Sequence, residues 1–218
     1  MFDQVNWDRM WAATIETAYM TSISVVITFI LGILLGLLLF LTSKGNLLEN
    51  KLINGITSSV VNIFRSIPFI ILIVLLIPFT KVLVGTIIGA NAALPALIIG
   101  AAPFYARMVE IALREIDKGV IEAARSMGAK TSTIIWRVLL PESMPALVSG
   151  ITVTAIAIVG YTAMAGFVGA GGLGNLAFLD GFQKFNTVVT VVCTVIILII
   201  VFIIQFIGDT ITRKLDKR

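Results

Sequence analysis

Long runs without a charged residue dominate the pattern of the chain. They cover Thr17–Ser43, Ser66–Thr80, Val82–Ala106, Ser143–Leu179 and Phe185–Gly208. A run of about 18 or more apolar residues is typical of a helix that crosses a membrane, so four of the five runs each predict a span. The pattern therefore predicts an all-α integral membrane protein.

A further span is predicted over Leu52–Phe79, although Arg65 interrupts it. This segment holds 18 Leu, Ile, Val or Phe residues. Each favours insertion by roughly 0.3–0.6 kcal/mol, against a cost of about 2.5–3.5 kcal/mol for one Arg. Because proline interrupts a helix, we expect a kink at Pro68. The chain 1–218 is then one transmembrane domain, with spans at about 17–42, 52–79, 82–106, 143–167 and 186–208 and a long loop at 107–142.

The positions of the basic residues predict the orientation, because cytoplasmic loops are enriched in Lys and Arg. With five spans the two termini face opposite sides, and a cytoplasmic C-terminus leaves only Arg9, Lys81 and Lys184 outside. The residues placed inside are Lys44, Lys51, Arg107, Arg114, Lys118, Arg125, Lys130, Arg137, Arg213, Lys214, Lys217 and Arg218. This bias of twelve to three predicts an outer N-terminus, an inner C-terminus and a cytoplasmic long loop.

Composition excludes several classes of function. The hydrophobic share of 58% and the mean hydropathy of +1.06 exceed the roughly 45–50% apolar share of soluble domains. The sequence contains no His, which excludes Ser-His-Asp hydrolases, HExxH metalloproteases and most zinc sites, so we predict neither catalytic nor metal-binding residues. The single Cys193 is expected to be a small hydrophobe, buried or facing lipid. Since the basic residues cluster at span ends, the net charge of +4 does not indicate nucleic-acid binding.

The sequence supports neither of two common nucleotide-binding motifs, the dinucleotide-binding fingerprint and the P-loop. Gly169–Gly174 matches GxGxxG literally, but no strand precedes it, no crossover unit surrounds it and no suitably placed acid follows it. These glycines instead predict a turn at the outer face after the fourth span. No GxxxxGK[ST] occurs, so any ATP must be bound by a partner.

A polar stripe marks the second span. Asn54, Ser58, Asn62 and Ser66 recur at every fourth residue, with Arg65 beside them, so they share one face of the helix. This face either lines a pathway or a partner, or makes hydrogen bonds between helices. An intramembrane Arg usually faces protein or water, so Arg65 either belongs to the pathway or gate, or snorkels or pairs with a fixed carbonyl.

Other features of the spans bear on the transport class and on packing. No Asp or Glu lies within them, which disfavours a carrier coupled to protons or sodium. Gly32–Gly36 and Gly85–Gly89 have the GxxxG spacing that permits close helix contact.

The long loop is expected to form short helices. Gly119 opens the first, Gly128 suits a left-handed C-terminal cap, Thr131 or Ser132 caps the next, and Pro141 ends it.

The most specific pattern lies in this loop. It reads Glu122-Ala123-Ala124, three residues, Gly128, nine residues, and then Val138–Pro141. Two alanines make a small face that another protein can approach closely, and the acid suits the start of a helix. Alternatively, the segment is an ordinary amphipathic surface helix.

This pattern resembles the EAA motif of bacterial ABC-importer permeases, with Val138 in place of the usual Ile. The resemblance implies that Glu122, Ala123, Ala124 and Gly128 contact an ATP-binding subunit.

Three further segments, Asn62–Phe69, Gly100–Glu110 and Gly169–Gly174, resemble the permease family of methionine importers. That family implies the type I ABC-importer permease fold in the bacterial cytoplasmic membrane. It also implies a homodimer in the lipid bilayer, two ATP-binding cassette subunits that bind ATP and Mg, an extracytoplasmic substrate-binding protein, and no cofactor in this chain. Methionine, in its L-form and with the D-form as a further candidate, would be imported by alternating access.

For the translocation pathway or gate we predict Asn62, Arg65 and Ser66 from the second span, with Tyr161 and Met164 from the fourth. Met164 has a second interpretation, since thioethers commonly fill gaps between helices.

Three rival functions stay open at this point. They are a permease for another small solute such as an osmolyte, a stand-alone channel or carrier, and an integral-membrane enzyme.

Overall fold

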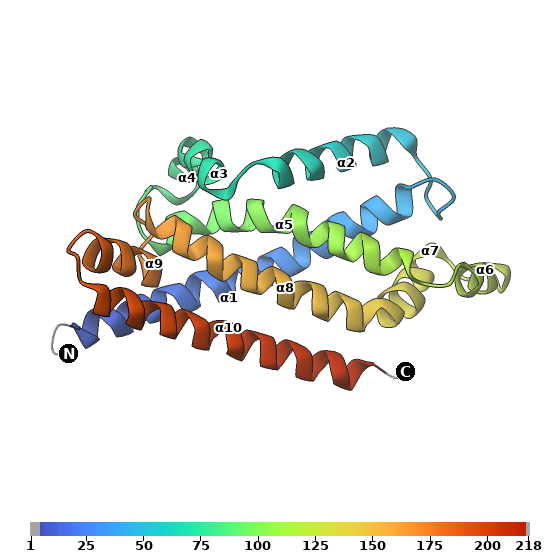
Figure 1. The fold of residues 1–218 in the computed structure, drawn as a ribbon. Coiled ribbons are helices and arrows are strands. Elements are labelled where there is room, and N and C mark those ends of the chain that lie inside the picture. The colour runs from blue at the N-terminus through green and yellow to red at the C-terminus, as the bar shows by residue number, and fades with distance from the viewer. Residues whose placement is uncertain (1–4, 217–218) are drawn as a thin grey trace.

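The computed structural model describes residues 5–216, so Lys217 and Arg218 of the charge count lie outside the described residues. Within that range the chain is helical, with no strand (Figure 1). In order, the elements are α1 (Trp7–Thr42), α2 (Lys51–Ser66), α3 (Phe69–Leu75), α4 (Ile77–Val84), α5 (Ala90–Arg114), α6 (Lys118–Ser126), α7 (Thr131–Ile134), the π-helix η2 (Ile135–Leu139), α8 (Leu140–Gly166), α9 (Gly172–Leu176), the π-helix η3 (Ala177–Phe182) and α10 (Thr187–Leu215).

The long helices lie side by side along one direction and alternate in sense (Figure 1). One end of the bundle carries the start of α1, the α3–α4 pair and α9, and the other carries the loop 43–50, α6 and α7. We call these the α9 end and the α6 end. The first helix, α1, begins at the α9 end and α10 runs toward the α6 end, as expected for a chain that crosses five times.

Four of the helical segments are long and apolar enough to cross a membrane. They are Trp7–Thr42, Ala90–Arg114, Thr131–Gly166 and Thr187–Leu215, which confirms the four spans predicted from the charge-free runs. The fifth is different, because α2 and α3 pass the same test only together and are bent by 107°.

The kink predicted at Pro68 is a sharp break, which divides the segment 52–79 between α2 and the two short helices α3 and α4. Ile67 has an extended backbone with φ −81° and ψ 123°. Proline disfavours the helical conformation in the residue before it and lacks the N–H that a continuing helix needs. The apolar run resumes as the two short helices α3 and α4.

Several other boundaries also differ from the prediction. The first span begins at Trp7 rather than 17, because the Asn6 side chain caps α1 by accepting from the Arg9 backbone N–H at 3.0 Å. The third begins at Ala90 rather than 82, because Gly85 and Gly89 have positive φ angles of 81° and 94° and separate α4 from α5. The fifth continues beyond 208 to Leu215.

The long loop forms short helices, with two corrections to their ends. Gly128 has φ 79° after α6, which confirms the left-handed cap. Lys130, rather than Thr131 or Ser132, occupies the N-cap of α7 and makes no side-chain cap bond. Pro141 ends nothing, because it lies in the first turn of α8, where a missing N–H costs no helical bond.

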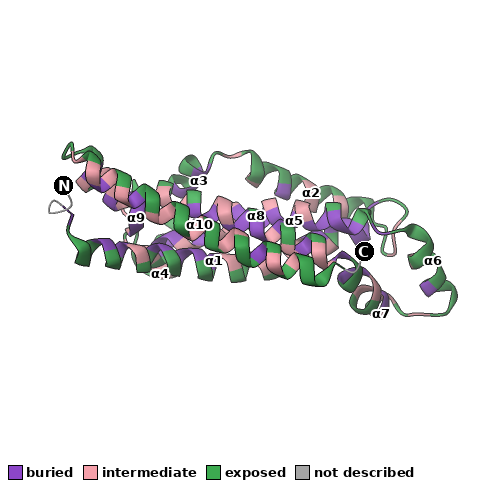
Figure 2. Cartoon of the chain, turned by 60° about the horizontal axis from the view of Figure 1, so that its bottom comes forward, coloured by how far each residue is buried: buried purple, intermediate pink, exposed green. Residues whose placement is uncertain are grey.

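Close contact between α1 and α5 organises the core. A Cβ on Gly36 would lie 2.5 Å from Val109 Cβ, and a Cβ on Gly32 would overlap the Tyr105 ring, so the first GxxxG pattern does mark a close helix approach. Tyr105 is fully buried and its hydroxyl donates to the Leu147 carbonyl of α8 at 3.1 Å. In Figure 2, buried residues follow the inner faces of α5 and α8, whereas α10 is mostly exposed or intermediate.

Candidate coupling helix and translocation cavity

The helix α6 extends beyond the bundle at the α6 end (Figure 1). Asp117 caps it, accepting from the Gly119 backbone N–H at 2.6 Å. Glu122 and Ala123 are exposed, as a contact with another subunit requires. Ala124, by contrast, is only 7% exposed and packs into the core beside Ile121, so it is unavailable for the predicted contact.

The reason is the angular step of the helix. Successive residues are about 100° apart, so adjacent alanines cannot share one face. The exposed apolar side of α6 instead combines Ala123 with Val120, which is 47% exposed, and Met127, which is 81% exposed. Sequence reasoning missed these two residues, although their spacing of three and four from Ala123 could have found them. We call Val120, Ala123 and Met127 the α6 strip.

The second half of the EAA-like pattern lies inside the protein. Leu139 and Leu140 are buried, and Val138 is partly buried against the same core as Ala124. This half therefore anchors the exposed α6 to the start of α8. The link between them consists of α7 and η2, and the π-helix η2 carries Trp136, which is 72% exposed.

A cavity of about 260 Å³ lies where the break after α2 meets α5 and α8. We call it the Arg65 cavity. Arg65 and Tyr161, predicted from separate spans to belong to one pathway, both line it. Its other lining residues are Phe64, Ile67, Phe69, Leu72, Gly100 and Phe104.

The wall of the Arg65 cavity is largely aromatic. The Phe69 and Tyr161 rings stack nearly parallel, with centroids 4.5 Å apart and an interplanar angle of 6°. Gly100 lets α3 approach α5, because a Cβ there would lie 3.3 Å from both Phe69 and Leu72. The cavity therefore combines one cation with flat apolar surfaces.

The other predicted pathway residues do not line this cavity. Asn62 and Ser66 are exposed along α2 and are bonded within it, since the Ser66 hydroxyl donates to the Asn62 carbonyl at 2.8 Å. Met164 is 43% exposed, one turn of α8 beyond Tyr161. The alternative role predicted for the polar stripe was hydrogen bonding between helices. Asn54 has this role, because its side-chain amide donates to the Leu39 carbonyl of α1 at 2.8 Å.

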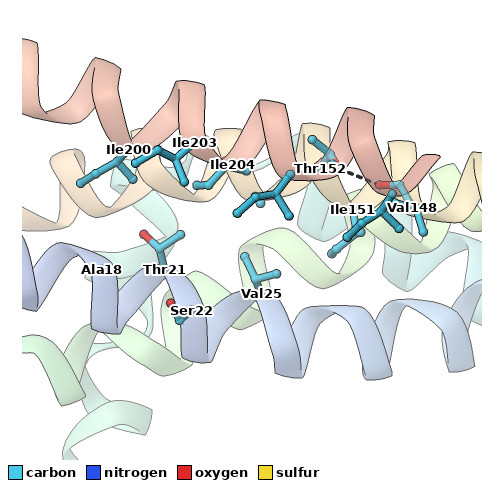
Figure 3. A pocket seen from close by; sticks show the side chains of 14 residues that line it. Ala18, Thr21, Ser22, Val25, Val148, Ile151, Thr152, Ile200, Ile203 and Ile204 are labelled. Atoms are coloured by element: carbon cyan, nitrogen blue, oxygen red, sulfur yellow. Dashed lines mark hydrogen bonds between the residues drawn. The ribbon is translucent and has the colours of Figure 1, made fainter. Parts of the chain in front are cut away.

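A larger cavity of about 440 Å³ lies between α1, α8 and α10 (Figure 3). Aliphatic side chains dominate its lining, and no charged residue belongs to it. Of its hydroxyl groups, that of Thr152 is already bonded to the Val148 carbonyl at 2.8 Å. This cavity therefore offers a bound molecule no charged partner, whereas the smaller Arg65 cavity contains a cation.

The glycine turn at the α9 end is held by α1. Gly169, Gly171 and Gly172 have positive φ angles, which confirms a turn after the fourth span. The Gly172 backbone N–H donates to the Glu16 carboxylate at 2.7 Å, and that of Leu173 donates to the Thr17 hydroxyl at 2.9 Å. The turn therefore has a fixed position on the bundle.

Ion pairs form around two further carboxylates, those of Asp180 and Glu110. Asp180 of η3 pairs with Arg9 of α1 and with Lys184. At the opposite end of the bundle, Glu110 of α5 is 3% exposed and pairs with Arg107 and Arg114. Across residues 5–216, no cluster of three or more His, Cys, Asp or Glu residues could hold a metal ion.

Comparisons with known proteins agree with this geometry. The family model described as "Binding-protein-dependent transport system inner membrane component" matches residues 29–218. The chain is 69% identical over 217 residues to the methionine import system permease protein MetP of Bacillus subtilis, covering 100% of this chain and 98% of that protein. It is 47% identical to the probable D-methionine transport system permease protein MetI of Vibrio cholerae, covering 98% of this chain and 95% of that one.

Solved structures give the same result. A chain of the MetNI methionine ABC transporter in an inward-facing conformation superposes with a TM-score of 0.94 at 47% identity, covering 98% of this chain and 100% of that one. An amino acid ABC transporter crystallised with histidines superposes with a TM-score of 0.77 at 20% identity. The second likeness concerns the fold alone.

Proposed function

The chain belongs to the family of binding-protein-dependent transport system inner membrane components, and from this premise we propose that it is the membrane-spanning permease of an ATP-driven methionine importer. Its fold is that of a type I ABC-importer permease, and a permease of this family is not itself catalytic. The observation that carries the proposal is the likeness over the full length to permeases named for methionine transport.

ATP hydrolysis then belongs to a partner. The sequence has no P-loop, and the exposed α6 strip presents apolar surface outside the bundle. We propose that an ATP-binding cassette subunit, which binds ATP and Mg, docks on α6 through this strip and the exposed Glu122. Gly128 shapes the end of α6, while the buried Ala124 attaches the helix to its own subunit.

Two copies of the chain would form the pathway, each with its own ATPase, in the lipid bilayer. Asn62, Arg65, Ser66 and Met164 are exposed in the single chain. Arg65 and Tyr161 also line its cavity, so all five residues lie where a second copy can complete a central path. ATP binding favours one arrangement of the pair and product release the other, which gives alternating access.

The orientation follows from charge. The α6 end carries most of the basic loop residues, so we propose that it is cytoplasmic and that the N-terminus is outside. The extracytoplasmic substrate-binding protein would then meet the α9 end, with its rigid glycine turn.

Co-purification and uptake test this function together. Tagged chain from native membranes should carry a stoichiometric ATPase, and the assembled transporter with its binding protein should accumulate methionine in proteoliposomes only with ATP. Ala123→Asp should abolish co-purification, because it places a charge within the α6 strip. Leu48→Asp makes the same kind of change at an exposed apolar residue of the same end and should leave assembly intact.

Other outcomes contradict the proposal in different ways. Solute movement without ATP or a partner would indicate a channel or carrier. ATP-dependent uptake that an osmolyte inhibits and methionine does not would keep the permease and change its substrate.

A further inference from the structure

We propose that the Arg65 cavity is a substrate site within the permease itself, which binds methionine by two points, its carboxylate and its thioether side chain. The inference rests on the proposed function, since it concerns the same solute. It goes further by giving this chain its own recognition step, separate from that of a binding protein.

The first recognition point is the guanidinium of Arg65, which lines the cavity, is exposed in the single chain and carries an unpaired charge. Within residues 5–216, Arg65 makes no hydrogen bond and no ion pair. Two cations of α5, Arg107 and Arg114, are by contrast paired with the Glu110 carboxylate. An Arg in a membrane-spanning segment is retained at a cost and usually faces an anion or water. Its planar fork matches a carboxylate with two parallel hydrogen bonds.

The second point is the aromatic wall. Phe64, Phe69, Phe104 and Tyr161 surround the cavity, and two of these rings are held in a stack. A thioether sulfur about 5 Å from an aromatic ring makes a favourable contact, and the adjoining methylenes gain from leaving water. The side chain of methionine therefore suits the wall as its carboxylate suits Arg65.

The lining of the cavity has no acidic partner for the ammonium group of methionine, which would be a third recognition point. No Asp or Glu belongs to it, so no carboxylate orients the ammonium group, which is left to ring faces or water. Handedness is recognised only when three positions around a carbon are fixed. The Arg65 cavity should therefore accept L- and D-methionine alike. It should also accept 4-(methylthio)butanoate, which lacks the amino group, and reject methioninol, which lacks the carboxylate.

Cysteine protection tests this at the cavity itself. The chain has one cysteine, Cys193, so Cys193→Ala gives a thiol-free chain and Ile67→Cys places one thiol on the lining. In the assembled transporter in nanodiscs, without binding protein, we would measure the rate at which methyl methanethiosulfonate, a small neutral reagent, modifies that thiol. Both methionine enantiomers and 4-(methylthio)butanoate should slow the reaction at similar concentrations, and methioninol should require at least about tenfold more.

Variants then assign the effect to the charge. Arg65→Gln should raise the protecting concentration of methionine at least about tenfold. Arg65→Lys, which keeps the charge without the fork, should give an intermediate value. Lys81→Gln removes a cation of α4 that does not line the cavity, and protection should persist. Co-purification of the ATPase verifies that each variant is assembled.

The results separate this inference from the function on which it rests. If the wild-type transporter imports methionine but methionine never protects the thiol, or protects equally in Arg65→Gln, the cavity is not a substrate site although the importer stands. A thiol that the reagent cannot reach also overturns the inference, because substrate could not reach the cavity either. If only L-methionine protects, the two-point recognition is wrong. If the wild-type transporter imports no methionine, the proposed function itself fails.

Discussion

Substituting Gly36 with Ala tests whether the contact of α1 with α5 holds the bundle together. A Cβ at this position would lie 2.5 Å from Val109 Cβ and 2.7 Å from the Ala106 carbonyl oxygen. Ordinary contacts of a Cβ lie at 3.4–4 Å, so the two helices must separate locally by about 1 Å. Because the closest atoms include backbone and a stiff β-branched side chain, rotation of a flexible side chain cannot relieve the overlap.

The cost can be estimated from this displacement. A gap of up to about 1 Å forfeits a quarter to a half of the dispersion energy of the atoms it separates. Overpacking of this kind costs about 1–3 kcal/mol of unfolding free energy. For a chain of this size each kcal/mol corresponds to about 2–4 °C. We therefore expect Gly36→Ala to lower the midpoint of thermal unfolding by a few degrees to about ten.

The chain carries its own probe for this measurement. Cys193 is fully buried, with its sulfur 3.7 Å from that of Met10. A fluorogenic maleimide should therefore react only as the purified chain unfolds in detergent. Gly55→Ala is the control, because its Cβ meets no atom within 4 Å, and alanine gains about 0.5–1 kcal/mol over glycine in a helix. Equal midpoints for the two variants would refute the packing argument.

Three other changes have defined outcomes. Gly128→Ala forces a Cβ into a backbone with φ 79° and should cost about 1 kcal/mol, visible as weaker co-purification of the ATPase; undiminished recovery would show that this turn does not shape α6. Glu110→Ala leaves two arginines of α5 without their shared carboxylate, so the same maleimide assay should report a loss of about 1–3 kcal/mol, and no change would mean that water or lipid phosphate compensates them. Glu16→Ala removes the acceptor of a turn N–H; hydrogen exchange at the glycine turn should quicken about tenfold, whereas an unchanged rate would show that the turn holds itself.

The spans were predictable because each depends on the summed transfer free energies of the residues in one segment of the chain. The four uninterrupted apolar runs all appear as helices long enough to cross a membrane, and the glycine-rich segment forms the expected turn. Their boundaries were less predictable. Gly85 and Gly89 could be interpreted as part of a helix-contact pattern, but their positive φ angles end one helix and precede another.

The candidate sites were likewise predictable only in part, because packing decided which of their residues are exposed. The pattern around Glu122 predicted a helix, and α6 is an exposed helix, but the prediction treated the adjacent Ala123 and Ala124 as equivalent. Packing buries Ala124 and leaves Ala123 outside, because the core covers only one side of α6. Met127 joins the exposed strip for the same reason.

The amino-acid sequence alone therefore determined that the chain is a helical membrane protein, which segments form its long apolar helices and which loop forms short helices outside them. These properties follow from transfer free energies and helix periodicity, which act over one segment at a time. Only the tertiary structure decided that the second span breaks by 107° and that Arg65 and Tyr161 meet in one aromatic cavity. Such contacts depend on how helices that are distant in the chain pack against each other. The hydropathy of a single segment does not contain that information.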